Sequence, residues 1–383
     1  MTIDLAAADE VFAASSDCTV GIEEEFMVLD AASLDLVPRF EELRDAAALE
    51  DPVLSEAIAG ELISSEIEIR SGKGEDVHDA LRRQRDVRAR LFALAEGRGI
   101  ALGATGTHPW ADYREQRNID TEHYHRVVDG LRYVARRNNT FSLHVHVGTH
   151  DLDRAVRACD RLRPVLPLLL SISANSPYLD DRDSGLHSAR SQAFTKSFPR
   201  CGIPDAFGSW KAYRDYVQFL IDTNSIVEYT QVWWSIRPHL SFGTVEVRIC
   251  DAQSSAAEAE ALTGLITACV GQALRDIDDG VPFTDPARRL VEENFWRAIR
   301  FGQDGKLIDL DRGEEFPAAA ATERLLAWTA PVRAELGLEP VFPTLNGAQR
   351  QRRAIDAGAS MQEVFATAVR ETTATYVQEA ETA

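Results

Sequence analysis

Alternating apolar and polar residues predict several β-strands in the first two thirds of the chain. Side chains of a strand point alternately to its two faces, so residues two positions apart share a face. Within residues 19–30 the apolar positions share one face, namely Val20, Ile22, Phe26 and Val28. Glu23 and Glu25 therefore share the opposite face. Further strands are expected at residues 34–37, 61–70, 100–105, 141–148, 232–237 and 243–250.

Apolar residues three or four positions apart predict helices elsewhere. Pro164 and Pro167 are expected to interrupt one of these helices. Residues 175–208 have little periodicity and are rich in Ser, Gly, Pro and charged residues, so we expect a loop that covers substrate. Strands that precede a helical last third indicate the α+β class. The helices are expected at residues 75–98, 121–137, 151–170, 210–222, 256–277, 288–299, 322–336, 349–357 and 361–379.

The composition is that of an ordinary globular protein, with 45% hydrophobic and 27% charged residues. No apolar run approaches the roughly 20 residues that span a bilayer. The formal net charge of −20 argues against nucleic acid or an anionic membrane as a partner, although a metal site could still attract ATP. The first 14 residues contain three acidic residues and no basic one, so we expect no secretory signal and a cytoplasmic protein.

Four of the expected strands carry two ionisable residues on one face. A single such pair is typical of a solvated sheet face. Four pairs on neighbouring strands would bring several carboxylates together, and like charges opposite each other destabilise a sheet. A bound divalent cation removes this repulsion: Mg²⁺ prefers carboxylate oxygens, and an imidazole beside them suits Mn²⁺ or Zn²⁺ better. The pairs are Glu23 with Glu25, Glu66 with Glu68, His144 with His146, and Glu246 with Arg248.

Arg248 lies two residues after Glu246 and shares its face. It can hold a phosphate group through two hydrogen bonds, or it can form a salt bridge to a glutamate of a neighbouring strand. Neither a Walker A loop nor a G-x-G-x-x-G motif occurs in the sequence, so nucleotide binding would need another scaffold. The G-x-S-x-G and H-E-x-x-H motifs of other enzyme classes are absent too.

Seven short motifs occur in order along the chain: Gly-Ile-Glu-Glu-Glu-Phe (21–26), Gly-Thr-His-Pro-Trp (106–110), His-Val-His-Val-Gly (144–148), Ser-Ala-Asn-Ser-Pro (173–177), Cys-Gly-Ile-Pro (201–204), Trp-Trp-Ser-Ile-Arg-Pro-His (233–239) and Gly-Thr-Val-Glu-Val-Arg (243–248). Together they resemble the glutamate–cysteine ligase type 2 family, also called carboxylate–amine ligases. The resemblance extends from about residue 19 to about residue 358. Each motif alone is a weak signal, but seven in register are specific.

The resemblance implies a fold similar to the catalytic domain of glutamine synthetase. A curved, mostly antiparallel sheet would form a cup for the active site, with helices packed on its outer face. ATP and Mg²⁺ ions would bind in the cup, with Mn²⁺ as an alternative. Residues 1–18 would form an N-terminal extension and residues 19–383 a single catalytic domain. The partners would be small molecules, namely ATP, glutamate and cysteine or another amine, and a homodimer stays open.

The resemblance also implies roles for individual residues. The metal that bridges the phosphates would be held by Glu23, His144 and Glu246. The metal nearer the substrate would be held by Glu25 and Glu68, with Glu61 as a weaker candidate. Arg248 would face the ATP phosphates, Arg237 would be a second active-site arginine, and Arg190 would hold a substrate carboxylate. His108, in the second motif, is a candidate for contact with substrate or nucleotide.

The chain departs from the family pattern at two places near the expected substrate site. It has Ser184-Gly-Leu186 where the family commonly has Thr-Gly-Tyr, and Ala252-Gln253 where Ser-Gln or Ser-Pro is usual. These differences concern the identity of the joined molecules more than the type of reaction.

The expected reaction begins with transfer of the γ-phosphoryl group of ATP to a substrate carboxylate, after which an amine attacks the acyl phosphate. With glutamate and cysteine the products would be γ-glutamylcysteine, ADP and phosphate. Glu66 or Asp251 would accept the proton of the amine. Three alternatives stay open: a ligase for a different pair of substrates, a phosphotransferase that stops at the phosphorylated product, and a metal-ordered binding protein without ATP turnover.

Overall fold

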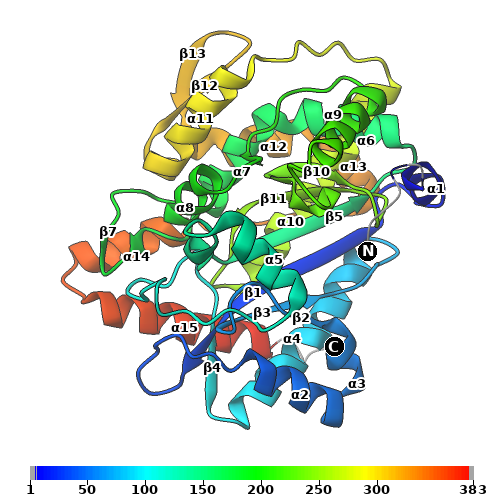
Figure 1. The fold of residues 1–383 in the computed structure, drawn as a ribbon. Coiled ribbons are helices and arrows are strands. Elements are labelled where there is room, and N and C mark those ends of the chain that lie inside the picture. Colours follow the sequence, from blue (N-terminus) through cyan, green and yellow to red (C-terminus); the bar gives the residue numbers. More distant parts are fainter. Residues whose placement is uncertain (1–4, 6, 379–383) are drawn as a thin grey trace.

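A seven-stranded sheet forms the centre of the molecule (Figure 1). The computed structural model describes residues 5 and 7–378. The strand order is β10-β11-β5-β1-β3-β2, β4 also pairs with β1, and all these pairings are antiparallel. The strands are β1 (Val20–Asp30), β2 (Ile58–Ala59), β3 (Glu66–Arg70), β4 (Ile100–Gly103), β5 (Ser142–Gly148), β10 (Ile236–His239) and β11 (Thr244–Asp251).

The register of these strands places their ionisable residues on one face of the sheet. Glu23 of β1 pairs with His144 of β5 on one side and with Arg70 of β3 on the other. Glu25 lies directly opposite Glu68. Since residues two apart share a face, the polar face extends along each strand. Two further pairs continue it to the edge strand, His146 with Glu246 and Glu246 with Arg237.

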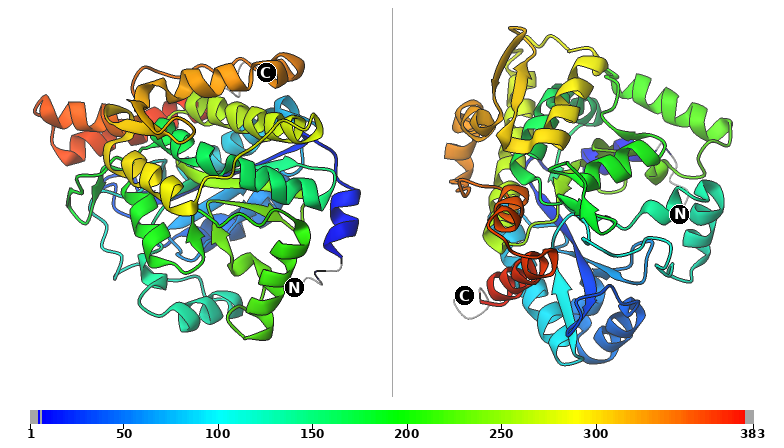
Figure 2. Two further views of the ribbon diagram at one scale, coloured as in Figure 1. Left: turned by 90° about the horizontal axis from the view of Figure 1, so that it is seen from above. Right: turned by 90° about the vertical axis from the view of Figure 1, so that its left-hand side faces the viewer.

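Helices cover the opposite, apolar face (Figures 1 and 2). α4 (Val77–Glu96) and α15 (Met361–Gln378) pack near β1 and β4, while α10 (Ala256–Asp278) packs near β5. α6 (Leu152–Leu162) and α7 (Leu166–Ser173) cover β10 and β11. The predicted α+β class, a curved antiparallel sheet with helices on its outer side, is confirmed, and the sheet is open. Apolar side chains of β1 fill this core and are at most 1% exposed: Ile22, Phe26 and Val28.

Shorter elements complete the molecule. Among the described residues, no helix is both long and apolar enough to cross a membrane. The other helices are α1 (Ala8–Ala13), α2 (Phe40–Glu50), α3 (Pro52–Ala57), α5 (Glu122–Leu131), α8 (Ala189–Ser197), α9 (Trp210–Asp222), α11 (Arg288–Phe301), α12 (Ala321–Trp328), α13 (Ala330–Leu336) and α14 (Gly347–Asp356). The other strands are β6 (Tyr178–Leu179), β7 (Arg182–Asp183), β8 (Cys201–Gly202), β9 (Trp233–Trp234), β12 (Lys306–Asp309) and β13 (Glu314–Pro317).

The N-terminal segment packs against the central sheet and its helices. Phe12 of α1 is fully buried in the same apolar cluster as β5 and α6, and the hydroxyl of Ser15 donates to the carbonyl of Gly243 at 2.8 Å. The boundary between an extension and a catalytic domain at residue 18 stays a prediction. Both predicted parts include residues outside those that the structure describes, namely residues 1–4 and 6 of the extension and residues 379–383 of the domain.

The structure differs from the expected elements in several places. Residues 175–208 do not form one loop, because α8 begins there with the side chain of Ser188 accepting from the N–H of Ser191. The helix expected at 322–336 is divided at Thr329, because Pro331 lacks an N–H and opens α13. The strand expected at 34–37 is a single bridge between Leu29 and Leu36, and the β12–β13 hairpin was not predicted.

Candidate active site

The polar face of the sheet borders a cavity of about 260 Å³. Strands β1, β3, β5, β10 and β11 supply its floor, and α5 and α8 contribute to its walls. The structure brings the predicted site residues to this cavity, with the exceptions of His108 and Asp251. The lining carboxylates are Glu23, Glu25, Glu61, Glu66, Glu68, Glu228 and Glu246, and the predicted basic residues are His144, Arg190, Arg237 and Arg248.

Three groups of side chains on this face could each hold a metal ion. In each group, one oxygen or nitrogen from every residue lies within 4.8 Å of the others. The groups are Glu23 with His146 and Glu246, Glu23 with Glu68 and His144, and Glu25 with Glu61 and Glu68. The resemblance placed His144 with Glu23 and Glu246, whereas the geometry places His146 there. His146 was not among the predicted ligands, although the His-Val-His spacing already put both imidazoles on one face.

Glu23 occupies the middle of these groups, between two imidazoles. Its Oε2 lies 3.2 Å from Nδ1 of His144 and its Oε1 lies 3.3 Å from Nε2 of His146. Burial raises the pKa of Glu23, but His146 and His144 outweigh it and hold the pKa well below its ordinary value. Glu23 is therefore an anion that can bridge two metal sites. Nε2 of His146 also lies 3.8 Å from Oε1 of Glu246, so this nitrogen stands between two carboxylates.

The carboxylates at the other end of the cavity repel one another. Burial, together with the charges of Glu25, Glu61 and Glu68, raises the pKa of Glu66 well above its ordinary value. Burial and the neighbouring Glu25 likewise raise the pKa of Glu61 to about 8. A divalent cation with oxygen ligands would remove this repulsion, so the donor set fits Mg²⁺ or Mn²⁺.

Two arginines flank Glu246 on the far side of the cavity. Nε of Arg237 lies 2.5 Å from Oε2 of Glu246, and Nη1 of the same arginine donates to the carbonyls of Thr230 and Val232. Nη1 of Arg248 also donates to Glu246, while its Nε is buried without a partner among the described residues. The salt bridge of Arg248 is made to Glu246 of its own strand and not to a glutamate of a neighbouring strand as one alternative expected, and one donor of Arg248 remains for an anion.

Arg190 reaches the same region from α8. Its Nη1 and Nη2 donate to the carbonyls of Ile249 and Arg248, each at 3.1 Å. Only 5% of the residue is exposed, and its Nε has no partner among the described residues. A buried guanidinium with an unused donor favours a bound anion.

Asp251 lies below Arg190, outside the residues that line the cavity. It is fully buried; Oδ2 accepts from the N–H of Asn175 and the hydroxyl of Ser176, and Oδ1 accepts from the hydroxyl of Ser188. The geometry therefore favours Asp251 as a residue that positions the 174–191 segment, and leaves Glu66 as the candidate proton acceptor that lines the cavity.

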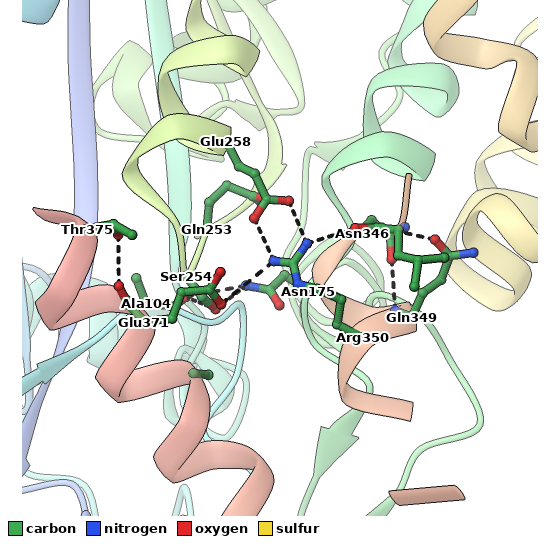
Figure 3. Close-up of polar contacts among 12 residues, drawn as sticks. Ala104, Asn175, Gln253, Ser254, Glu258, Asn346, Gln349, Arg350, Glu371 and Thr375 are labelled. Carbon is green, nitrogen blue, oxygen red and sulfur yellow. Dashed lines mark hydrogen bonds and ion pairs between the residues drawn. The ribbon is translucent and has the colours of Figure 1, made fainter. Parts of the chain in front are cut away.

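The C-terminal helices hold this segment from the outer side (Figure 3). The amide of Asn175 donates to the carbonyl of Ala104 at 3.3 Å and to the hydroxyl of Ser254 at 3.1 Å. Arg350 of α14 forms a two-point ion pair with Glu258 at the start of α10. Nε2 of Gln351 on α14 also donates to Oδ1 of Asn175 at 2.7 Å, so α14 holds the segment directly and is itself tied to α10.

His108 is fully buried away from the cavity. Its Nε2 lies 2.8 Å from the carbonyl of Leu34, its Nδ1 accepts from the N–H of Ala111, and its ring packs against Trp110 and Phe365. Burial lowers the pKa of His108 to about 4, so the ring is neutral. The predicted contact with substrate is not supported by this placement, because every polar atom of the ring has a partner within the fold.

A second, larger cavity of about 560 Å³ lies beside Glu23 at the other end of β1. Glu23 lines both cavities, whereas His146 lines only this one. Gly21 and Gly72 are among its lining residues. The other lining residues include Arg70, Lys73, Thr244 and Phe242, whose ring is 53% exposed.

The sequence matches the model of a protein family described as glutamate-cysteine ligase family 2 over residues 19–379. A relative from Solibacter usitatus, named "Putative glutamate--cysteine ligase 2", is 36% identical over 362 residues, which cover 92% of this chain and 93% of the relative. A relative from Rubrobacter xylanophilus, named "Putative glutamate--cysteine ligase 2-1", is 36% identical over 359 residues, which cover 92% of this chain and 94% of the relative.

Solved structures of related ligases share the fold. The glutamate–cysteine ligase of Francisella tularensis, solved with AMP, superposes with a TM-score of 0.67 at 12% identity, covering 94% of this chain and 89% of that one. A bifunctional glutathione synthetase from Pasteurella multocida gives 0.64 at 13% identity and covers 97% of this chain; this chain spans 54% of its length. The family match and the relatives place the chain in glutamate–cysteine ligase family 2, as a carboxylate–amine ligase that uses ATP.

Proposed function

We propose that the chain activates a carboxylate with ATP and Mg²⁺ and joins it to an amine, and that glutamate with cysteine is a pair it accepts at low rate. The observation that carries this proposal is one continuous polar surface, in which carboxylates and imidazoles lead directly to two arginines around Glu246. Relatives that carry glutamate and cysteine in their names support this pair as the first to test. Mn²⁺ would serve in place of Mg²⁺ because two imidazoles lie among the oxygen ligands.

The metal ligands follow the three groups of side chains. Glu23, His146 and Glu246 would hold the cation nearer the second cavity, and Glu25, Glu61 and Glu68 would hold the other. His144 lies 3.2 Å from Glu23 and 3.8 Å from Glu25, and so would support one ligand of each site. When bound, these cations neutralise charge on the phosphate groups.

The two cavities suit different substrates. The larger one would take the nucleotide, because Gly21 and Gly72 add no side chains to its lining and Phe242 offers a ring for stacking. Arg70 and Lys73 line the same cavity and would lie close to phosphate oxygens. The cavity between the carboxylates and the arginines would take the acid and the amine.

The residues of the chain then have distinct tasks. A carboxylate oxygen of the acid bonds to the γ-phosphorus of ATP as the bond from this phosphorus to the β–γ bridging oxygen breaks, which releases ADP. Arg248 would donate its unused Nε–H to an oxygen of the transferred group. The amine nitrogen next bonds to the acyl carbon, the carbon–oxygen bond to phosphate breaks, and Glu66, whose Oε2 has no partner among the described residues, would take the amine proton.

The test is ADP release with ATP and Mg²⁺ in the presence of glutamate, cysteine or both. Glu23→Gln, Glu25→Gln and Glu246→Gln are expected to abolish the reaction while circular dichroism shows an intact fold. Glu96→Gln, at an exposed position of α4, is the matched control and should keep full activity. Activity that persists in all three cavity variants contradicts the metal assignment, and ADP release that never depends on an amine indicates a phosphotransferase instead.

A further inference from the structure

One face of α8 combines a buried arginine with aromatic rings. Arg190 and Phe194 are four residues apart and so share a face of the helix, and Phe198 follows directly after its last residue. The ring centroids of Phe194 and Phe198 are 4.7 Å apart, and Phe198 meets Trp233 of β9 edge-on at 5.8 Å. All of them line the cavity that holds the carboxylates. We call Phe194, Phe198 and Trp233 the aromatic wall.

The aromatic wall lies on the basic side of the cavity. Arg237 donates to the carbonyl of Val232, the neighbour of Trp233, at 2.6 Å, and Arg190 of α8 donates to the carbonyl of Arg248. Five of the lining carboxylates come instead from β1, β3 and the segment between β2 and β3, on the other side of β5 in the strand order. Glu246 of β11 is ion-paired with Arg237 and Arg248, and Glu228 lies in the segment before β9, so three arginines face two carboxylates on this side. The cavity therefore has an acidic side and a side that is basic and aromatic.

This division separates the two substrates by charge. A protonated amine is attracted to the acidic side, whereas a carboxylate is attracted to the arginines. The unused Nε donors of the two arginines provide two anion contacts on this side. Arg248 would contact the phosphoryl group, and Arg190 would contact the carboxylate of the acid. The body of an acid held in this way has to extend along the nearest surface, which is the aromatic wall.

We propose that the acid activated by this enzyme carries an aromatic or branched apolar group, and that the aromatic wall binds this group. The proposal rests on the proposed ligase function and names its preferred acyl donor. The side chain of glutamate would place polar atoms against Phe194 and Trp233, which are only partly covered by the protein itself. An aryl or branched alkyl group would cover these rings and remove their apolar surface from water.

The experiment separates activation of the acid from the identity of the amine. The full chain is incubated with ATP, Mg²⁺ and hydroxylamine, whose nitrogen displaces phosphate from any acyl phosphate and gives a hydroxamate. The acids are 3-phenylpropanoate, 4-methylpentanoate, glutamate and acetate. We expect kcat/KM for hydroxamate formation to be at least tenfold higher with 3-phenylpropanoate than with glutamate.

Variants of the aromatic wall test its role directly. Phe194→Ala and Trp233→Ala should each lower kcat/KM for 3-phenylpropanoate at least tenfold through KM, while the rate with acetate stays within about twofold. Phe194→Leu should retain most of the rate with 4-methylpentanoate. Trp296→Ala, an exposed aromatic residue of α11 outside this cavity, is the matched control and should change neither rate.

The outcomes distinguish this proposal from the ligase function on which it rests. Glutamate hydroxamate formed as fast as the aryl product, or equal losses with acetate and 3-phenylpropanoate in the wall variants, overturns the aromatic preference alone. The absence of ADP and hydroxamate with every acid overturns both proposals.

Discussion

The carboxylate of Glu25 accepts two hydrogen bonds from Ser142 on the neighbouring strand β5. The backbone N–H of Ser142 donates to Oε2 at 2.5 Å and its hydroxyl donates to the same oxygen at 2.6 Å. The hydroxyl also lies 2.8 Å from Nε2 of His144. Ser142 thus orients Glu25, which belongs to one ligand group with Glu61 and Glu68, without being a member of any ligand group itself.

Replacement of Ser142 by alanine should weaken metal binding while the fold remains intact. The backbone donor stays in place, but Glu25 loses the hydroxyl that restricts its rotation. Loss of such an outer hydrogen bond typically lowers metal affinity about 10- to 100-fold. Titration of Mn²⁺ by electron paramagnetic resonance measures this directly, with Ser142→Thr as the variant that keeps the hydroxyl. Equal Mn²⁺ affinity in wild type and Ser142→Ala would show that the hydroxyl plays no part.

Removal of Arg88 should strongly destabilise the protein. Arg88 is 1% exposed; its Nε and Nη2 each lie 2.7 Å from Glu24, and its Nη1 lies 2.8 Å from Glu260. Arg88→Met leaves Glu24 buried on β1 without its cation, and removal of one partner from a buried pair costs about 3–5 kcal/mol. Urea unfolding measures the loss.

The double variant Arg88→Met with Glu24→Gln tests whether the unpaired carboxylate of Glu24 causes this loss of stability, because the second substitution removes that charge. It should be more stable than Arg88→Met alone. Arg44→Met, at an exposed ion pair with Asp45, is the surface control and should cost less than about 1 kcal/mol. A loss below that size for Arg88→Met would contradict the argument.

The sequence predicted the strands that carry the site because their side chains alternate strictly. β1, β5 and β11 lie within one residue of their expected bounds, and the pairs Glu23–Glu25 and Glu246–Arg248 do share a face. This alternation is a local property, so a single sequence is enough to reveal it. Ligand sets are different, because they depend on which strands are neighbours and in which register. His146 joins Glu246 only through the pairing of β5 with β11.

The segment that carries Arg190 was not predicted as a helix for a physical reason. α8 buries a guanidinium against backbone carbonyls and exposes part of Phe194, so it lacks the apolar stripe that marks a helix packed on a core. The prediction for His108 had the opposite difficulty, because a local sequence pattern suggested a binding role that its distant contacts do not support. A loop histidine beside Pro109 and Trp110 resembles a binding residue in sequence, yet it serves the fold through Leu34, which lies 74 residues away.

The neutral ring of His108 should make stability depend on pH. Burial lowers its pKa to about 4, whereas an exposed histidine titrates near 6.5. As the pH falls from about 6.5 to about 4, the imidazole of His108 becomes protonated in the unfolded chain but stays neutral in the folded chain. The unfolded state is thereby favoured, so the free energy of unfolding decreases. The loss attributable to His108 is on the order of 3 kcal/mol. In His108→Asn, urea unfolding should show a shallower decrease over this range; an unchanged slope would disprove the assignment.

Replacement of Asp251 by asparagine should separate positioning from proton transfer. The amide keeps the size of Asp251, but one of the donors from Asn175, Ser176 and Ser188 loses its acceptor, and Arg190 above them loses its fixed place. We expect KM for the acid to rise about tenfold, with KM for ATP and the pH profile of kcat unchanged. A proton acceptor would instead lose about 10²–10⁴ in kcat together with the pH dependence. Asp160→Asn, which removes a buried acceptor of backbone N–H groups outside the cavity, is the matched control for nonspecific destabilisation.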